Sequence, residues 1–254
     1  MPVRPDPESA VDSLLLADDG ATLARLRLED DGREPAVKDV RPLPGAAPAK
    51  VAAQLRRDLA GRMLKTTHEG LVAALLADGL TLHRAATGLR HDLAELPPPA
   101  ALPDGWSLVH AGWDDDLAVA CASAYGPEHP DGEWQAADTR EIRAMFDDAE
   151  PVPPLLSASA RVVGPDGRSA GHVLCAGPVP WTTNTCGWIL NIAVAPHAQG
   201  SGLGRALLTH ALRGTHAAGL PTLDLSVVDQ NPARRLYDKA GFRPVTRMFS
   251  VALP

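Results

Sequence analysis

Apolar residues recur in two rhythms along the chain, alternating in some segments and returning every three or four positions in others. Short apolar or alternating runs between turn residues predict strands, and the wider spacing predicts helices. In the first part of the chain we expect strands over 13–16, 21–28 and 80–86 and helices over 51–64 and from about 66 to 78. Later we expect strands over 106–110, 155–163, 169–176 and 188–194, helices over 117–124 and 139–146, and then a helix, a strand, a helix and a final strand.

A proline-rich connector at 96–105 divides this pattern into two parts. Three consecutive prolines favour an extended, semi-rigid segment. The sequence therefore predicts an N-terminal α+β domain over residues 1–98 and a second, mixed α/β domain over 103–254. Another proline-rich stretch, 41–48, is expected to separate a hairpin from a helix, and the Thr66-to-Glu69 spacing indicates a capping box.

A glycine-rich segment at 199–205 follows an apolar strand and opens a helix whose apolar stripe includes Leu203, Leu207 and Ala211. Glycines let the backbone approach a ligand closely, and the free N–H groups of a first helical turn favour a phosphate. Arg205 occupies the slot that a dinucleotide-binding G-x-G-x-x-G motif reserves for glycine, and there is no P-loop lysine. The alternative is a glycine-rich turn without a ligand.

A second motif covers residues 231–242. Asn231 is the expected N-cap, Pro232 the first helical residue and Gly241 the C-terminal stop. Asn231, Arg234 and Tyr237 recur every three positions, so they are expected to share one face of the helix.

Together these motifs resemble the GNAT superfamily of acetyl-CoA-dependent N-acetyltransferases. Residues 199–204 fit the Q/R-x-x-G-x-G/A signature, and 231–242 fit N-x-x-A-x-x-L-Y-x-x-x-G-F with one fewer residue between Asn and Ala. The resemblance covers 103–254 and is specific over 188–242. It implies an α/β (α+β) GNAT fold with a mixed, mostly antiparallel central sheet beside a smaller N-terminal α+β domain.

The resemblance also implies a coenzyme A site. The strand end is expected to bind the pantetheine, the loop the pyrophosphate, and Tyr237 to protonate the sulfur, with the Val194 amide as oxyanion donor. Simple packing of Tyr237 on the cofactor is the alternative reading. The implied cofactor residues are Ile192, Ala193, Val194, Gln199, Gly200, Ser201, Gly202, Leu203, Gly204, Arg205, Asn231, Ala233, Arg234 and Tyr237.

The general base is not evident in the sequence. In the resembling families a carboxylate often stands at the positions of Ser226 or Trp188, and neither residue is acidic here. This departure puts the protein-substrate subfamilies in doubt. Asp224 shares a strand face with Ser226, but we expect a solvent-facing charge there. A bound water that relays the proton is another alternative.

The turn-rich loop after residue 125 supplies the acceptor-site candidates, because this loop lies over the acceptor cleft in the resembling family. A plain solvated loop is the alternative, and the prolines and glycines argue against a metal site. Trp181 is a further residue that either walls a substrate site or simply packs. The loop candidates are Glu128, His129, Asp131, Glu133 and Trp134.

Composition narrows the partners. The net charge is −7, and the sequence has no cluster of basic residues, so we do not expect it to bind nucleic acid. The negative charge weakly favours a cationic amine as substrate. No apolar run is long enough for a membrane span, and the N-terminus lacks a signal-peptide core. Cys121, Cys175 and Cys186 are too few for a disulfide framework, which favours buried thiols and a cytoplasmic location.

A segment of the N-terminal half resembles the predicted helix of residues 231–242, which contains Tyr237 and is called the tyrosine helix below. When Gly79 is aligned with Gly241, Leu75 falls where Tyr237 stands, so this half is either a degenerate GNAT-like half or an unrelated α+β cap. No glycine signature precedes Leu71. We expect this half to bind no coenzyme A and to support the fold, the acceptor cleft or a homodimer contact.

The sequence therefore predicts an enzyme that transfers an acetyl group from acetyl-CoA directly to a primary amine, on a small molecule or a peptide N-terminus. A catalytically weak or inactive acyl-CoA-binding or regulatory module is the alternative. The missing carboxylates favour that alternative, and the retained Tyr237 argues against it.

Overall fold

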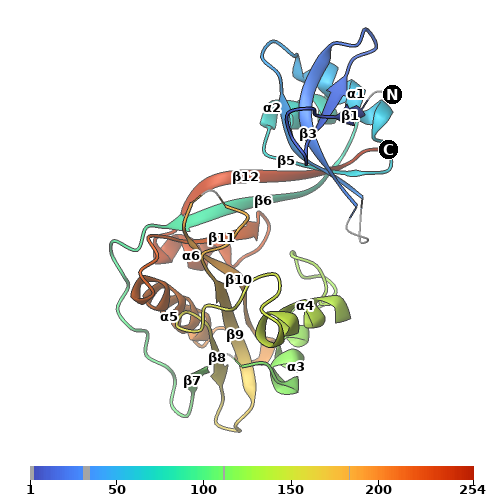
Figure 1. Ribbon diagram of the computed structural model, residues 1–254. Coiled ribbons are helices and arrows are strands. Elements are labelled where there is room, and N and C mark those ends of the chain that lie inside the picture. Colours follow the sequence, from blue (N-terminus) through green and yellow to red (C-terminus); the bar gives the residue numbers. More distant parts are fainter. Residues whose placement is uncertain (1–2, 31–34, 111, 183) are drawn as a thin grey trace. The chain divides into compact units, whose positions relative to one another are not determined.

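A computed structural model describes residues 3–30, 35–110, 112–182 and 184–254. It contains two compact units: unit 1 comprises Met1–Thr87 and Thr246–Pro254, and unit 2 comprises Gly88–Val245 (Figure 1). Two strands, β6 (Leu82–His91) and β12 (Arg243–Ala252), each contribute residues to both units. The division into domains at residues 98 and 103 stays a prediction.

Unit 1 is a sheet of order β1-β2-β3-β4-β5-β12 with two helices. Strands β4 and β5 are parallel, and the other pairs in this sheet are antiparallel. Leucine and valine side chains from the sheet and from both helices form its core. The elements are β1 (Val3–Pro5), β2 (Ser13–Leu16), β3 (Thr22–Glu29), β4 (Ala36–Pro42), α1 (Pro48–Asp58), β5 (Met63–Thr66) and α2 (Glu69–Ala77).

The structure corrects two sequence predictions in unit 1. The helix expected over 51–64 ends at Asp58, and Met63 and Leu64 belong to β5 instead, where they pair with β12. A strand contributed from the far end of the chain is invisible to local periodicity. The capping box is also wrong, because the Nδ1 atom of His68, 3.0 Å from the backbone nitrogen of Leu71, caps α2.

Unit 2 is a sheet of order β6-β11-β10-β9-β8-β7 covered on both faces. Helix α5 packs on one face and α3 and α4 on the other (Figure 1). Strand β9 is buried along its whole length because both faces are covered. The elements are β7 (Ser107–His110), α3 (Asp115–Ala124), α4 (Ala136–Asp147), β8 (Ala160–Val163), β9 (Ser169–Ala176), β10 (Gly187–Val194), the 3₁₀ turn η1 (Pro196–Ala198), α5 (Leu203–Ala217), β11 (Leu223–Val228) and α6 (Arg234–Ala240).

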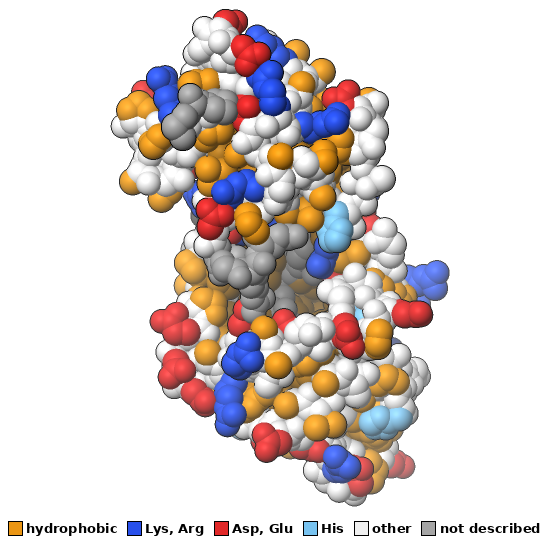
Figure 2. Space-filling view, turned by 90° about the vertical axis from the view of Figure 1, so that its right-hand side faces the viewer, with side chains coloured by type: hydrophobic (Ala, Val, Ile, Leu, Met, Phe, Trp, Pro, Cys, Tyr) orange, Lys and Arg blue, Asp and Glu red, His pale blue; other side chains and the backbone are white. Residues whose placement is uncertain are grey.

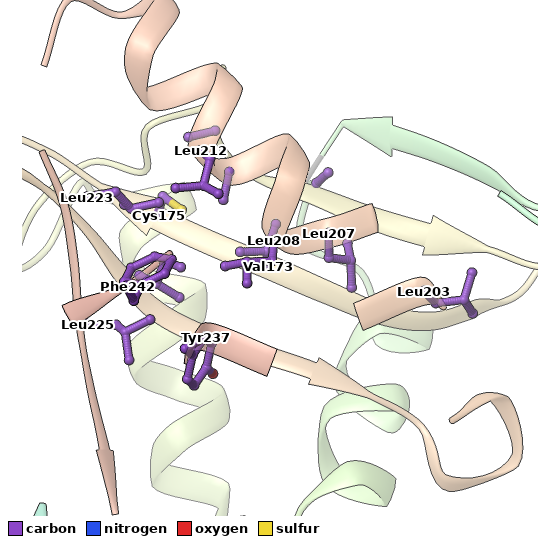
Figure 3. Close-up of a cluster of buried hydrophobic side chains, with 14 of the residues drawn as sticks. Val173, Cys175, Leu203, Leu207, Leu208, Leu212, Leu223, Leu225, Tyr237 and Phe242 are labelled. Atoms are coloured by element: carbon purple, nitrogen blue, oxygen red, sulfur yellow. The ribbon is translucent and has the colours of Figure 1, made fainter. Parts of the chain in front are cut away.

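The core of unit 2 forms where α5 meets β9 (Figure 3). Leu207 and Leu208 of α5 are fully buried with Val173 and Cys175. Gly214 allows the helix to approach this closely, because a Cβ atom there would lie 1.9 Å from the carbonyl oxygen of Ser157. Residues 155–159 before β8 form a turn instead of the start of the expected strand. This packing fixes α5, and therefore the glycine-rich loop before it.

Two segments of the chain repeat one order of strand, helix, strand, helix and strand: β4-α1-β5-α2-β6 and, apart from the short turn η1, β10-α5-β11-α6-β12. The parallel pair β4–β5 of unit 1 corresponds to the parallel pair β10–β11 of unit 2. Gly79 and Gly241 both end a helix with positive φ, and Leu75 is fully buried at the position that corresponds to Tyr237. The last helices and strands of the N-terminal half therefore repeat those of the C-terminal half, with a leucine in place of the tyrosine.

Surface charges of both signs are interspersed on the face drawn in Figure 2. Within the described ranges, no helix has the length and apolar character that crossing a membrane requires.

Candidate functional site

Strands β10 and β11 part soon after they begin. They pair in parallel only at Gly187 with Leu223 and at Trp188 with Asp224, although β10 continues to Val194. The backbone of Ala195 bonds to Ala170 beside β9, so by alternation Val194 and Ile192 turn their N–H and C=O groups toward the β11 side. The expected strand end therefore presents backbone groups that β11 does not pair.

Ala193 differs from its two neighbours. Its carbonyl oxygen faces β9, where it would lie 2.5 Å from a Cβ atom on Gly171. A glycine at position 171 therefore lets β9 approach β10 at the point where β10 diverges from β11. The backbone of Ala193 supports the sheet, and the backbone groups of Ile192 and Val194 lie on the open side.

The glycine-rich loop exposes the start of α5. Gly200 and Gly202 have φ of +77° and +88°, a conformation that side chains disfavour. The first intrahelical bond joins the Ala206 N–H to the Gly202 carbonyl, so the N–H groups of residues 203–205 have no helical partner. In the described part of the chain no other group bonds them. A diphosphate fits this turn, because N–H groups and the helix dipole both favour an anion.

Two side chains of the loop, Gln199 and Ser201, hydrogen-bond to nearby backbone carbonyls. The amide Nε2 of Gln199 donates to the carbonyl of Val194 over 2.9 Å, and the Ser201 hydroxyl donates to the Ala198 carbonyl over 2.6 Å. The Leu203 side chain is buried in the core, while Arg205 is exposed. The loop's backbone and the exposed Arg205 side chain are therefore the parts that can contact a ligand.

Helix α6 lies against the same loop. A Cβ atom on Gly204 would lie 3.6 Å from Leu236 of α6 and 3.9 Å from Val194 of β10. The start of α5, the end of β10 and helix α6 therefore lie together. The helix begins at Arg234, later than expected, because Asn231 accepts the N–H of Ala233 in a preceding turn.

Tyr237 is buried within this arrangement, and its ring meets Phe242 edge-on with centroids 5.9 Å apart. Burial, together with the negative charge of Asp131, raises the pKa of Tyr237 above its ordinary value. Its phenol is therefore protonated at neutral pH, as a proton donor requires. Arg234, expected at the cofactor, pairs with Asp238 over 3.0 Å.

The loop between α3 and α4 reaches the same region. Asp131 accepts a hydrogen bond from the side-chain amide of Asn231, and the Nδ1 atom of His129 lies 3.9 Å from the Asp131 carboxylate. The rings of His129 and Trp134 lie 4.3 Å and 5.5 Å from the ring of Tyr125. Three of the five expected acceptor residues thus cluster around Tyr125. The side chains of Glu128 and Glu133 are exposed.

Comparison with known proteins decides the family. The model of the Acetyltransferase (GNAT) family matches residues 118–242, a range that contains the glycine loop, the diverging strand and Tyr237. Residues 118–242 form a GNAT acetyltransferase domain.

Related sequences agree with this GNAT assignment. Over 200 residues the chain is 31% identical to the mycothiol acetyltransferase of Acidothermus cellulolyticus, covering 72% of this chain and 59% of the relative. Over 176 residues it is 35% identical to the mycothiol acetyltransferase of Streptomyces avermitilis, covering 65% of this chain and 52% of the relative. The chain thus spans between about half and three fifths of the length of these curated relatives.

Solved structures share the GNAT fold over nearly the whole chain. The GCN5-related N-acetyltransferase from Sphaerobacter thermophilus has a TM-score of 0.67 at 18% identity, covering 95% of this chain and 79% of that one. A tandem GNAT protein from the clavulanic acid biosynthesis pathway has a TM-score of 0.60 at 19% identity, covering 98% of this chain and 85% of that one. The likeness shows the fold, N-terminal half included.

Sequence reasoning missed a chain of polar side chains in the GNAT domain, two of them buried and two half-buried. Asn191 of β10 donates to the phenol oxygen of Tyr125 over 3.0 Å and accepts from Nε2 of His172 on β9. The Nδ1 atom of that imidazole lies 3.4 Å from the sulfur of Cys121 on α3. Burial lowers the pKa of His172 to about 4, so the ring is neutral. His172 and Asn191 each interrupt an otherwise apolar strand, and this pattern could have indicated the polar contact from the sequence.

Asp224 corrects a sequence prediction. Its side chain is buried, not solvent-facing, and Arg90 of β6 holds both carboxylate oxygens at 2.7–3.1 Å. The guanidinium thus occupies both oxygens of this carboxylate. At the other family positions, Ser226 is exposed, and the Trp188 ring meets the exposed Trp181 edge-on, with centroids 6.4 Å apart.

The three cysteines are buried, as expected. Burial raises the pKa of the Cys121 thiol to about 12 and also raises the pKa of the Cys175 and Cys186 thiols, so none is a thiolate at neutral pH. Among the residues that the structure describes, no three His, Cys, Asp or Glu side chains are grouped so that they could hold a metal ion.

Proposed function

We propose that this chain is an N-acetyltransferase that moves an acetyl group from acetyl-CoA directly to a primary amine. The supporting observation is the meeting of three features: the unpaired N–H groups of residues 203–205, the end of β10 that leaves β11, and the buried, protonated Tyr237. The family match supports acetyl-CoA as the donor.

In this proposal the backbone at the start of α5 binds the diphosphate of coenzyme A, and the unpaired edge of β10 binds the pantetheine. The fit rests on the positive φ of Gly200 and Gly202, which turns the loop's N–H groups outward without a side chain in the way. The Val194 N–H lies on the open side of β10, where it can donate to the oxyanion that forms during transfer.

Tyr237 is proposed as the general acid. When the C–S bond breaks, its electron pair goes to sulfur, and the phenol supplies the proton that completes the free thiol. The raised pKa keeps the phenol protonated over the working range of pH. Tyr237 is 5% exposed, and this burial limits the access of water to its phenol.

For the acceptor we propose a small polar molecule that bears a primary amine. Several relatives are named mycothiol acetyltransferases, which favours a small-molecule acceptor over a protein. The absence of a carboxylate at residues 188 and 226 supports the same choice, because protein-acetylating subfamilies of the GNAT superfamily often have one there.

The test is release of free thiol from acetyl-CoA with a panel of amines: deacetylated mycothiol, glucosamine, tyramine, spermidine and a short peptide with a free N-terminus. We expect turnover with at least one small amine. Tyr237→Phe should lower kcat about 100-fold or more and leave coenzyme A affinity within about twofold. Gly202→Ala should weaken coenzyme A binding about tenfold because its φ of +88° strains a side chain.

Gly79→Ala is the matched control, since it places a side chain at a similar φ of +85°, also with nothing within 4 Å, at a helix end outside the glycine loop. Tight coenzyme A binding with no thiol released for any amine would support a regulatory binding module instead. Failure to bind coenzyme A at all would refute both readings.

A further inference from the structure

His91 is a buried histidine at the end of β6 that the proposed mechanism does not use. Its Nδ1 atom accepts the backbone N–H of Leu93 over 3.0 Å. Leu93 has a φ of +58°, so this bond holds a left-handed turn just after the strand. Burial lowers the pKa of His91 below its ordinary value, so the ring is neutral at pH 7 and carries its proton on Nε2.

The far end of this imidazole lies against the C-terminal end of α6, within unit 2. A Cβ atom on Gly241 would lie 3.1 Å from Nε2 and 3.4 Å from Cδ2 of His91. The imidazole also meets the ring of Phe242 edge-on, with centroids 5.3 Å apart. A hydrogen bond to the Ala240 backbone adds to these contacts. His91 therefore contacts the residues that end α6.

Phe242 connects this contact to Tyr237. Its buried ring meets the Tyr237 ring edge-on, with centroids 5.9 Å apart (Figure 3). Its backbone N–H donates to the Tyr237 carbonyl over 3.1 Å, and the N–H of Gly241 donates to the Asp238 carbonyl over 3.2 Å. These two bonds form the Schellman pattern that ends many helices. Tyr237 and Phe242 thus belong to one turn, and a shift of Phe242 displaces Tyr237.

Helix α6 depends on such contacts for its orientation. It has seven residues, and a helix of this length is not stable in isolation. On one side, Leu236 lies against Gly204 at the start of α5. At its C-terminal end, His91 of β6 lies against Gly241 and Phe242. The sheet therefore holds the end of the helix through one side chain of β6.

We propose that His91 is a positioning residue for Tyr237. Its imidazole joins β6 to the last turn of α6 and, through the ring of Phe242, holds the Tyr237 phenol where protonation of the sulfur requires it. The inference rests on the proposed acetyl transfer with Tyr237 as general acid. It adds to that mechanism a residue that acts without touching cofactor or acceptor.

The first test compares His91→Asn with His91→Gln. Asparagine keeps an acceptor for the Leu93 N–H but is too short to reach α6, whereas the glutamine amide can reach the place of Nε2. His91→Asn should lower kcat for thiol release about tenfold or more, because a small displacement of a catalytic group is costly. His91→Gln should keep kcat within about threefold of wild type. Coenzyme A affinity should stay within about twofold in both, since the glycine loop is unchanged.

A double variant tests whether His91 acts through the phenol. Tyr237→Phe keeps the ring beside Phe242 but has no proton to donate. In that background His91→Asn should lower kcat by less than about twofold more, because residues that act together give non-additive losses.

Val162→Ala is the matched control for lost stability. Val162 is buried in β8, and three strands separate β8 from β6 in the sheet. The variant should lower the melting temperature and keep kcat within about twofold of wild type.

Phe242→Leu is a second variant that tests the same connection if His91→Asn does not fold. Leucine keeps a buried apolar side chain but removes the ring contacts with both His91 and Tyr237. It should lower kcat about tenfold and leave coenzyme A affinity within about twofold.

Fluorine NMR measures the surroundings of Tyr237 without turnover. The chain has two tyrosines, Tyr125 and Tyr237, so the signals of protein labelled with 3-fluorotyrosine are assigned by replacing each with phenylalanine. His91→Asn and Phe242→Leu should shift or broaden the Tyr237 signal and leave the Tyr125 signal in place. Val162→Ala should move neither signal.

The outcomes separate this inference from the proposed function. A Tyr237 signal that depends on His91, in a protein that releases no thiol with any amine, would support the connection and refute acetyl transfer. Unchanged kcat and unchanged signals in His91→Asn or Phe242→Leu would overturn the role of His91 and leave acetyl transfer standing. Equal losses of kcat in His91→Asn and Val162→Ala, or a full further loss in the Tyr237→Phe background, would also overturn it.

Discussion

The side-chain amide of Asn191 lies 3.0 Å from the phenol oxygen of Tyr125, which joins the middle of β10 to the loop that carries Asp131. The same amide accepts from His172, so one side chain satisfies two others in the interior of the domain. Buried polar groups of this kind are costly to leave unpaired.

Asn191→Ala should therefore lower the free energy of unfolding by about 2 kcal/mol, because the buried His172 loses its acceptor. It should also lower kcat/KM about tenfold by freeing Tyr125, with coenzyme A affinity unchanged. Urea titration and thiol-release kinetics measure the two effects. A double variant with Tyr125→Phe should lose less activity than the sum of the single losses. Additive losses would show that the bond has no part in positioning.

His172 makes stability depend on pH. Burial holds its folded pKa at about 4, below the ordinary value of 6.5, so the unfolded chain binds the proton more readily. The free energy of unfolding is therefore highest above pH 6.5. It falls as the pH drops toward 4, and His172 accounts for about 3 kcal/mol of this loss. Denaturant titrations between pH 4 and 7 should show the slope. Burial also lowers the pKa of His91 and His210, so the wild type must be compared with His172→Gln, which should show a shallower slope.

Asp224→Asn should lower the stability of the protein and leave the kcat of the folded enzyme nearly unchanged. The substitution leaves Arg90 without the anion that binds it, which should cost about 3 kcal/mol of stability. The kcat of the folded variant should stay within about threefold of wild type, because Arg90 already occupies both oxygens of this carboxylate. Asp147→Asn, which breaks an exposed pair with Arg143, is the matched control and should cost under about 1 kcal/mol. A loss of kcat near 100-fold would restore Asp224 as a candidate base.

Gly214→Ala should destabilise unit 2. The added methyl group would lie 1.9 Å from the Ser157 carbonyl, so α5 must move away from the chain before β8. Overpacking of this kind costs about 1–3 kcal/mol or more and outweighs the gain in helix propensity. Thermal unfolding measures the loss, and Gly204→Ala in the same helix, with space for its methyl group, should show none. Equal melting temperatures for Gly214→Ala and wild type would contradict the close packing.

Local pattern was enough for much of the fold. Strands at Ser13–Leu16 and Ser169–Ala176 have the expected bounds, and the glycine stop at Gly241 holds as predicted. These features depend on neighbours within a few positions, so periodicity and backbone preference decide them. The prediction failed at Met63 and Leu64, which become a strand because β12, contributed by the last residues of the chain, pairs with them.

The sequence by itself determined the motifs: a glycine loop before an apolar helix, and a tyrosine helix ended by Gly241. Each motif lies within a short segment of the chain, and the resemblance to the GNAT superfamily rests on the residue spacing within these segments. Only the tertiary structure decided which polar residues meet. It buried Asp224 against Arg90 and brought Asp131 to Asn231 and Asn191 to Tyr125, pairs separated by 66 to 134 positions. Such contacts follow from strand order and packing, which no local pattern specifies.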